Sequence, residues 1–274
     1  MKSAFVLAVE PDIRPLGLGG DFETNARFIS DLGFNGSELS IMDAKSIDTK
    51  RIKEITKRYD LDIPAIGAGR YFLKHGLFFS SKDKEVRRKA VQAVGEFTLF
   101  AGKLNSHFII GPVQGNFENT YEEGFQQMRD CLRECAKVAE AEGVLLLLEP
   151  INRFTPAIIR TIEAGIRMID EVDSSSVKML VDTFHMNIEE RSMTESIRKA
   201  KGYVGHVHFS DSNRLAPGQG HIDFRSIANV LQEIDYHGFV SGEILPEPDG
   251  ESAARWTIEL IDSLPYQVRG RFRI

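Results

Sequence analysis

The chain has 274 residues, of which 42% are hydrophobic and 27% are charged, so it can bury a sizeable core and is not expected to be disordered. Its 34 basic and 40 acidic residues give a formal net charge of −6, which argues against a nucleic-acid partner because such partners select basic surfaces. The apolar run at residues 4–9 is too short for a signal sequence or a membrane span, and the two cysteines fit a reducing compartment. We therefore expect a cytoplasmic protein without a membrane partner.

Short apolar runs alternate along the chain with longer amphipathic segments, which is the pattern of repeated βα units. Strands are predicted at residues 4–9, 36–40, 63–67, 106–110, 144–149, 177–182, 204–209 and 239–243. Helices are predicted at residues 22–32, 48–58, 84–103, 121–142, 158–170, 194–200, 224–234 and 252–263. Gly33, Gly143 and Gly202 are expected to end the first, fourth and sixth helices, because glycine tolerates the left-handed conformation found after a helix.

The interiors of the predicted strands are apolar, as in the leucine-rich run at 144–148, and such strands are typical of a parallel sheet covered on both faces. Eight βα units without an intervening linker predict an α/β fold with one (β/α)8 TIM barrel over residues 1–264, followed by a basic tail at 265–274. An open doubly wound sheet is the alternative. The glycines at 17, 19 and 20 lack the position and spacing of the dinucleotide-binding fingerprint that such a sheet would carry.

Four consecutive predicted strands of the second half carry, at or near their ends, residues that commonly bind metals. Glu149, Asp182 and Glu243 terminate strands, and His208 lies near the end of the seventh strand. In a barrel the carboxyl ends of the strands surround one mouth, so these side chains are expected to converge there. Three carboxylates and one imidazole suit a divalent ion such as Mn²⁺, Mg²⁺ or Co²⁺, and they do not exclude Zn²⁺.

Two further side chains are predicted to face a ligand at this mouth. His185 follows the sixth strand and can reach a ligand hydroxyl or support a metal ligand. Arg214 lies in the loop after the seventh strand, where a guanidinium can bind sugar hydroxyls, a carboxylate or a phosphate. His206 is expected one layer deeper than His208, in a structural role. Asp211 can orient a histidine or cap the following turn, and both possibilities stay open here.

The two glutamates provide a way to move a proton on a sugar. Glu149 and Glu243 can face opposite sides of a substrate whose carbonyl and adjacent hydroxyl are bound to the metal. One carboxylate removes a proton beside the carbonyl to give an enediolate, and the other returns a proton to the opposite face, which is epimerisation. Return of the proton to the neighbouring carbon would give aldose–ketose isomerisation, and the residue types do not distinguish the two reactions.

Three segments resemble the ketose 3-epimerase group, which includes the D-tagatose and D-psicose 3-epimerases, of the xylose-isomerase-like TIM barrels. They are EPINRF at 149–154, VDTFHMNIEE at 181–190 and DSNRLAPGQGH at 211–221. Further segments resemble the 5-keto-L-gluconate epimerase branch more than the tagatose enzymes. They are AIGAG at 65–69, GL at 76–77 and DKEVR at 83–87, together with DSNR at 211–214. The order of elements is similar to that of the family from residue 5 to residue 264.

This resemblance implies a divalent metal, usually Mn²⁺, Co²⁺ or Mg²⁺, and a small-molecule ketose or keto sugar acid that reacts at C3. The implied metal ligands are Glu149, Asp182, His208 and Glu243. The two glutamates are also the implied acid and base, and His185 and Arg214 are the implied substrate contacts. Thr155 stands where family members commonly have glutamate, which leaves the identity of the sugar open. The family also implies a homodimer or homotetramer.

Other functions share these residues. An aldose–ketose isomerase or a keto-polyol dehydratase could use the same metal site, since an enediolate is a natural intermediate of both. A damage-specific endonuclease of the related barrels would need more histidine and acidic ligands and a basic mouth, which seven histidines and a net charge of −6 do not supply. A non-catalytic sugar-binding protein that retains the metal is the remaining alternative.

Overall fold

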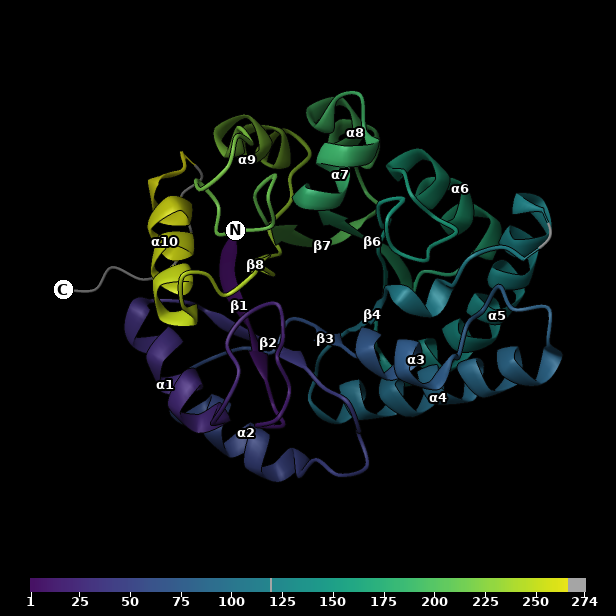
Figure 1. The fold of residues 1–274 in the computed structure, drawn as a ribbon, viewed down its shortest axis with the longest axis horizontal. Coiled ribbons are helices and arrows are strands. Elements are labelled where there is room, and N and C mark those ends of the chain that lie inside the picture. Colours follow the sequence, from purple (N-terminus) through teal and green to yellow (C-terminus); the bar gives the residue numbers. More distant parts are fainter. Residues whose placement is uncertain (119, 266–274) are drawn as a thin grey trace.

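The computed structural model describes residues 1–118 and 120–265, and its centre is a closed barrel of eight parallel strands (Figure 1). Each strand pairs with the next one in the chain, and β1 also pairs with β8, which closes the ring. This order confirms the predicted TIM barrel and excludes an open doubly wound sheet, whose edge strands would each have one unpaired side. The strands are β1 (Lys2–Ala8), β2 (Gly36–Ser40), β3 (Ile66–Gly67), β4 (Phe108–Ile110), β5 (Leu146–Leu148), β6 (Val177–Asp182), β7 (Val204–Phe209) and β8 (Phe239–Gly242).

Helices surround the strands and follow one another around the ring in chain order, as Figure 1 shows. They are α1 (Phe22–Leu32), α2 (Thr49–Arg58), α3 (Gly69–His75), α4 (Lys84–Lys103), the 3-10 helix η1 (Pro112–Gln114), α5 (Tyr121–Glu142), α6 (Ile162–Val172), α7 (Thr183–Glu189), α8 (Met193–Lys199), α9 (Phe224–Glu233) and α10 (Gly250–Ser263). Within the described residues, no helix is both long enough and apolar enough to cross a membrane.

Helix ends follow local signals that the sequence partly revealed. Gly33 and Gly143 end α1 and α5 with φ angles of +103° and +66°, as predicted. The end predicted at Gly202 is wrong, because Ala200 is the C-cap of α8 and Gly202 lies in the following turn with φ of +84°. Helix α6 begins at Ile162 rather than at 158, because the Thr161 hydroxyl accepts a hydrogen bond from the Ala164 amide and caps the helix there.

Three short helical segments lie in loops at the carboxyl ends of strands, where the sequence predicted none. Helices α3 and η1 follow β3 and β4, and α7 begins directly after β6. Segments of one or two turns show too few apolar repeats for periodicity to reveal them. Because active sites of TIM barrels are built from these loops, the added helices shape the mouth of the barrel.

The interior of the barrel has an apolar part and a polar part. Apolar side chains of the segments around β3 to β6 form a cluster of their own, separate from the main core between strands and helices. These are Ala65, Ile109, Leu147 and Leu180. On the opposite side of the ring, Glu38 of β2, His206 and His208 of β7, and Ser241 of β8 are all buried. The polar part adjoins the predicted site, because His208 belongs to both.

The main hydrophobic core is one cluster that includes residues from Met1 to Leu264, which fits a single barrel domain. Cys131 and Cys135 are free and buried in α5, where they pack as small apolar residues. The boundary between the barrel and a basic tail at 265–274 stays a prediction, because residues 266–274 lie outside the described residues.

Candidate active site

The ends of four neighbouring strands bring the predicted metal-binding residues together. Glu149 follows β5 directly, Asp182 is the last residue of β6, His208 lies in β7 and Glu243 follows β8. One ligand atom from each of these side chains lies within 4.8 Å of the corresponding atoms of the other three. Glu149, Asp182 and His208 are buried, and the Glu243 side chain is 22% exposed. The group is therefore accessible from one side.

Two of the atoms that face the centre of this group lack hydrogen-bond partners. Nδ1 of His208 lies 3.6 Å from Oδ2 of Asp182, 3.6 Å from Oε2 of Glu243 and 3.9 Å from Oε1 of Glu149. Both Nδ1 of His208 and Oδ2 of Asp182 are buried without a hydrogen bond among the described residues. Buried polar atoms are rarely left unpaired. Two potential ligand atoms without hydrogen bonds lie together with two further carboxylates, and such a group fits a divalent cation.

Burial and neighbouring carboxylates raise the pKa values of two residues of this group, Glu149 and His208. Burial, followed by the charge of Glu243, raises the pKa of Glu149 well above its usual range. Burial alone would lower the pKa of His208, but the carboxylates of Glu38 and Glu243 raise it well above the ordinary value. A divalent cation can replace protons that are retained in this way, because metal binding requires deprotonated ligands.

Glu38 is a buried acidic residue that the sequence analysis missed. Its two carboxylate oxygens lie 3.1 and 3.2 Å from Nε2 of His208, and one of them lies 2.8 Å from Nε2 of His206. His206 is buried beneath His208, which agrees with its predicted structural role. The only local signal for Glu38 was an acidic residue in the middle of a short strand that the fold would have to bury.

His185 is held by the helix that begins at the end of β6. Oδ1 of Asp182 accepts hydrogen bonds from the amides of Phe184 and His185, which caps α7 and directs the His185 side chain into the site. Nε2 of His185 lies 3.7 Å from Oε1 of Glu149. Burial lowers the pKa of His185, which favours the neutral ring.

Asn152 determines which nitrogen of His185 carries the proton. The Asn152 side-chain oxygen accepts a hydrogen bond from the Phe154 amide at 3.0 Å, so its NH₂ group is the end that faces His185. That NH₂ group lies 2.8 Å from Nδ1 of His185 and donates to it. Nε2 of the neutral ring therefore carries the proton and can donate to a ligand oxygen. The sequence analysis did not predict this role for Asn152.

Arg214 reaches the site from the loop after β7, where its backbone has a φ of +62°. Its guanidinium Nη2 donates to Oε2 of Glu243 at 2.9 Å, and its Cζ atom lies 4.9 Å from the centre of the Phe184 ring. Asp211 accepts hydrogen bonds from three backbone amides of the same loop, those of residues 212, 218 and 222. Of the two roles left open for Asp211 in the sequence, these bonds favour capping of the turn.

A pocket of about 240 Å³ opens at the carboxyl ends of the strands. Glu149, Glu243, His185 and Arg214 line it, and so does Thr155. Its apolar lining residues include Leu16, Ile41, Leu73 and Ile151. An apolar wall with a few convergent polar groups is typical of a small-molecule site. In α3, Leu73 lies at this pocket, whereas Phe72 is buried in the core.

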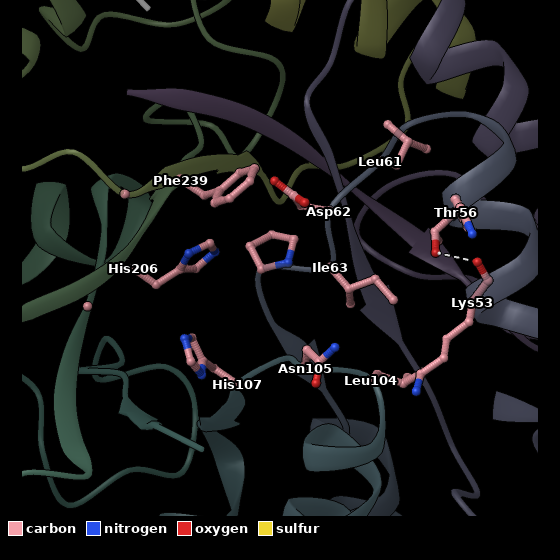
Figure 2. Close-up of a pocket in the computed structure, with 14 residues that line it drawn as sticks. Lys53, Thr56, Leu61, Asp62, Ile63, Leu104, Asn105, His107, His206 and Phe239 are labelled. Carbon is pink, nitrogen blue, oxygen red and sulfur yellow. Dashed lines mark hydrogen bonds between the residues drawn. The ribbon is translucent and has the colours of Figure 1, made fainter. Parts of the chain in front are cut away.

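A second pocket of about 550 Å³ lies at the opposite, amino ends of the strands (Figure 2). Residues that precede strands line it, among them Ile63, Asn105 and His107, and His206 forms part of its wall. None of the six predicted site residues lines this pocket. The active-site side of a TIM barrel is the carboxyl end, so the smaller pocket is the candidate active site.

Comparisons with known proteins place these features among characterised enzymes. The profile of one family, described as "Xylose isomerase-like TIM barrel", matches residues 26–264. The chain is 32% identical over 229 residues to a D-psicose 3-epimerase of Enterocloster bolteae, a match that covers 80% of this chain and 75% of that protein. It is 38% identical over 167 residues to a D-psicose 3-epimerase of Ruminiclostridium cellulolyticum, covering 59% of this chain and only 57% of the relative.

A solved structure also resembles the chain over nearly its whole length. The crystal structure of a D-psicose 3-epimerase with D-tagatose from Clostridium cellulolyticum superposes with a TM-score of 0.81 at 26% sequence identity. The superposition covers 98% of this chain and 99% of that one. Fold and sequence therefore point to the same group of proteins.

Proposed function

Because the chain belongs to the xylose isomerase-like TIM barrel family and, within it, to the ketose 3-epimerase group, we propose that this enzyme inverts C3 of a ketose or keto-aldonate with a divalent metal ion. The observation that carries the proposal is the convergence of three carboxylates and the unpaired Nδ1 of His208 within 4.8 Å. Two of these carboxylates, Glu149 and Glu243, also line the pocket in which a sugar would lie.

The proposed metal ligands are carboxylate oxygens of Glu149, Asp182 and Glu243 together with Nδ1 of His208. Such a set suits Mn²⁺ best, with Co²⁺, Mg²⁺ and Zn²⁺ as alternatives. When bound, a divalent ion supplies Lewis-acid stabilisation of the negative charge that develops on the sugar's carbonyl oxygen. Oδ2 is the oxygen that Asp182 has available, since its Oδ1 caps α7.

The two glutamates would carry the proton. One of Glu149 and Glu243 accepts the proton from C3 while the other, in its carboxylic acid form, donates a proton to the opposite face of the same carbon. His185 donates from Nε2 to a sugar oxygen, and Asn152 keeps it in that tautomer. Arg214 holds Oε2 of Glu243 at 2.9 Å and so fixes the carboxylate in the pocket.

The charges at the pocket favour a sugar acid among the proposed substrates. Thr155 lines the pocket where family members commonly have glutamate, so that acidic side chain is missing here. Arg70 of α3 also lines the pocket and makes no ion pair with any residue in the described part of the chain. A guanidinium without an ion pair, in a pocket that also has the neutral Thr155 in its lining, suits the carboxylate of a keto-aldonate. Homodimeric or homotetrameric assembly and a cytoplasmic location stay predictions.

The test uses protein freed of metal, Mn²⁺, and a panel of ketohexoses and keto-aldonates in D₂O, with products resolved by NMR. We expect a C3 epimer that carries deuterium at C3. An aldose product would instead support the isomerase, an enone product the dehydratase, and binding without exchange of any C–H proton a sugar-binding protein. Each of these three outcomes would overturn the epimerase.

The Glu243→Gln variant tests the two-carboxylate mechanism. We expect it to lower kcat by about 10²–10⁴-fold, because a glutamine amide can neither accept nor return the proton. Metal content is measured in the same samples, since the variant also changes a proposed ligand. Epimerisation at the wild-type rate with Mn²⁺ bound would contradict this mechanism.

A further inference from the structure

We propose that Glu38 is a positioning residue, which fixes the orientation and tautomer of His208 so that Nδ1 faces the metal, and that His206 holds Glu38 in place. This inference rests on the metal site of the proposed function. It assigns a role to a carboxylate and an imidazole that lie beneath the proposed ligands and would not themselves touch the substrate.

The hydrogen bonds of His208 determine its tautomer. Nε2 lies 3.1 and 3.2 Å from the two oxygens of Glu38, and an ionised carboxylate can only accept, so Nε2 must donate. Metal binding requires the neutral ring, and a neutral imidazole with its proton on Nε2 has its lone pair on Nδ1. Nδ1 is the atom that lies 3.6 Å from Oδ2 of Asp182 and lacks a hydrogen bond. Glu38 therefore directs the lone pair of His208 into the metal-binding group.

His206 restricts the carboxylate from the other side. Its Nε2 lies 2.8 Å from Oε2 of Glu38, and the Ser241 hydroxyl lies 3.0 Å from the same nitrogen. The rings of His206 and His208 are nearly perpendicular, at 86°, with centres 5.3 Å apart. Hydrogen bonds to two imidazoles at different angles therefore fix the orientation of the Glu38 carboxylate.

Glu38 and His206 also separate the two ends of the barrel. His206 lines the pocket at the amino ends of the strands (Figure 2), and Glu38 lines the pocket at their carboxyl ends. A buried carboxylate is costly unless charged or polar groups compensate it. Both compensating groups here are imidazoles, and one of them is the proposed ligand. That arrangement matches a carboxylate that orients a metal-bound histidine and raises its basicity.

Glu38, His206 and His208 could in principle hold a second ion, since their ligand atoms also lie close together. Nε2 of each histidine, however, lies at hydrogen-bond distance from a carboxylate oxygen of Glu38. A metal between them would have to replace these hydrogen bonds. The unpaired Nδ1 of His208 faces the other group. We therefore assign Glu38 to positioning rather than to a second metal site.

The Glu38→Gln variant tests the proposal through metal affinity. It keeps the shape of the side chain but removes the charge and one of the two acceptor oxygens. We expect its Kd for Mn²⁺, measured by isothermal titration calorimetry, to rise by about 10–100-fold. The matched control is Glu190→Gln, because Glu190 accepts hydrogen bonds from the Ile162 amide and the Ser196 hydroxyl away from the site. Its Kd for Mn²⁺ is expected to equal that of the wild type.

Equal Mn²⁺ affinity in Glu38→Gln and wild type would overturn the proposal and leave the proposed function standing. Absence of Mn²⁺ binding in the wild-type protein would overturn both. A second measurement does not depend on the folding of a variant. In wild-type protein loaded with Mg²⁺ and labelled with ¹⁵N-histidine, we expect NMR to find the proton of His208 on Nε2. A proton on Nδ1 in the loaded protein would overturn the inference.

Discussion

Several residues of the site use their two polar atoms for different purposes. Oδ1 of Asp182 caps α7 while Oδ2 faces the metal-binding group, and Nε2 of His208 bonds to Glu38 while Nδ1 stays free. In Asn152, likewise, the side-chain oxygen accepts from the Phe154 amide while the NH₂ group donates to His185. One atom of each side chain is fixed by the fold, which holds the other in a defined place for a ligand.

The raised pKa of Glu149 predicts a pH-dependent stability of the metal-free protein. A carboxyl group whose pKa is higher in the folded state than in the unfolded state must lose its proton in the folded protein as pH rises. Its contribution to the free energy of unfolding therefore falls between the two pKa values, by at most about 1.4 kcal/mol per pH unit. With a chelator present, we expect Glu149→Gln to be more stable than wild type at pH 8.

Urea unfolding of both proteins between pH 5 and pH 8 measures this effect. The difference in the free energy of unfolding is expected to shrink towards pH 5, because that pH lies close to the ordinary pKa of glutamate in the unfolded chain. With saturating Mn²⁺ at pH 8, the wild type should instead be more stable than Glu149→Gln, since the ion binds the ionised ligands of the wild type. A difference that does not change with pH would argue against a raised pKa of Glu149.

At the scale of elements, the loop from β7 to α9 depends on one carboxylate. Asp211 is fully buried and accepts hydrogen bonds from the amides of Ser212, Gly218 and Ile222. The loop closes so tightly on it that a Cβ atom at Gly220 would lie 2.3 Å from Oδ1 of Asp211. This compact loop is what presents Arg214 to the pocket.

Removing that carboxylate should disturb substrate binding more than metal binding. Asp211→Ala leaves three backbone amides without their acceptor, and we expect it to lower the free energy of unfolding by about 1–3 kcal/mol and to raise KM, because Arg214 loses its fixed position. The Kd for Mn²⁺ is expected to change less than KM, since Glu243 alone among the four proposed ligands bonds to Arg214 and none of them lies in this loop.

Asp223→Ala is the matched control for this loop. Asp223 caps α9 through the Ser226 amide and lies at the surface, so its loss is expected to cost about 1 kcal/mol of stability without changing KM. Chemical unfolding and steady-state kinetics of the two variants provide the comparison. An equal KM in Asp211→Ala and wild type would contradict a positioning role of the loop.

At the scale of the whole molecule, closure of the barrel assembles the site. The four proposed ligands come from neighbouring strand ends, β5 to β8. Glu38 comes from β2 and meets His206, which is 168 residues away in the chain, across the interior. Since both halves of the barrel contribute, a bound metal would stabilise the entire fold rather than one part of it.

Mn²⁺ is therefore expected to raise the Tm of a single unfolding transition. At a free concentration of about 100 times Kd, a ligand that binds only the folded state adds about 2.7 kcal/mol. For a domain of this size that corresponds to a rise of roughly 5 °C. Differential scanning calorimetry measures it. Two separate transitions would contradict the single barrel domain, and an unchanged Tm would contradict the metal site.

The sequence alone predicted the eight βα units and the proposed ligands because both depend on local pattern, whereas the strand order excluded an open sheet. Apolar runs of strand length alternate with amphipathic helices, and Glu149, Asp182 and Glu243 are charged residues at the points where such runs end. A charged side chain there must lie at the barrel mouth, whatever the details of packing. His208 and Arg214 followed from the same reasoning, and so did His185, which lies just beyond a strand.

Only the tertiary structure decided how these side chains are held. Glu38 is one acidic residue in a short strand, and nothing near it in the sequence reveals two imidazoles on a strand 168 residues away. The hydrogen bond from Asn152 to His185 was equally invisible, because it joins two separate loops. The short helix α7 was missed because two turns show too few apolar repeats. Position along a strand is a local property, whereas the tautomer of His208 and the orientation of His185 depend on neighbours that only the closed barrel supplies.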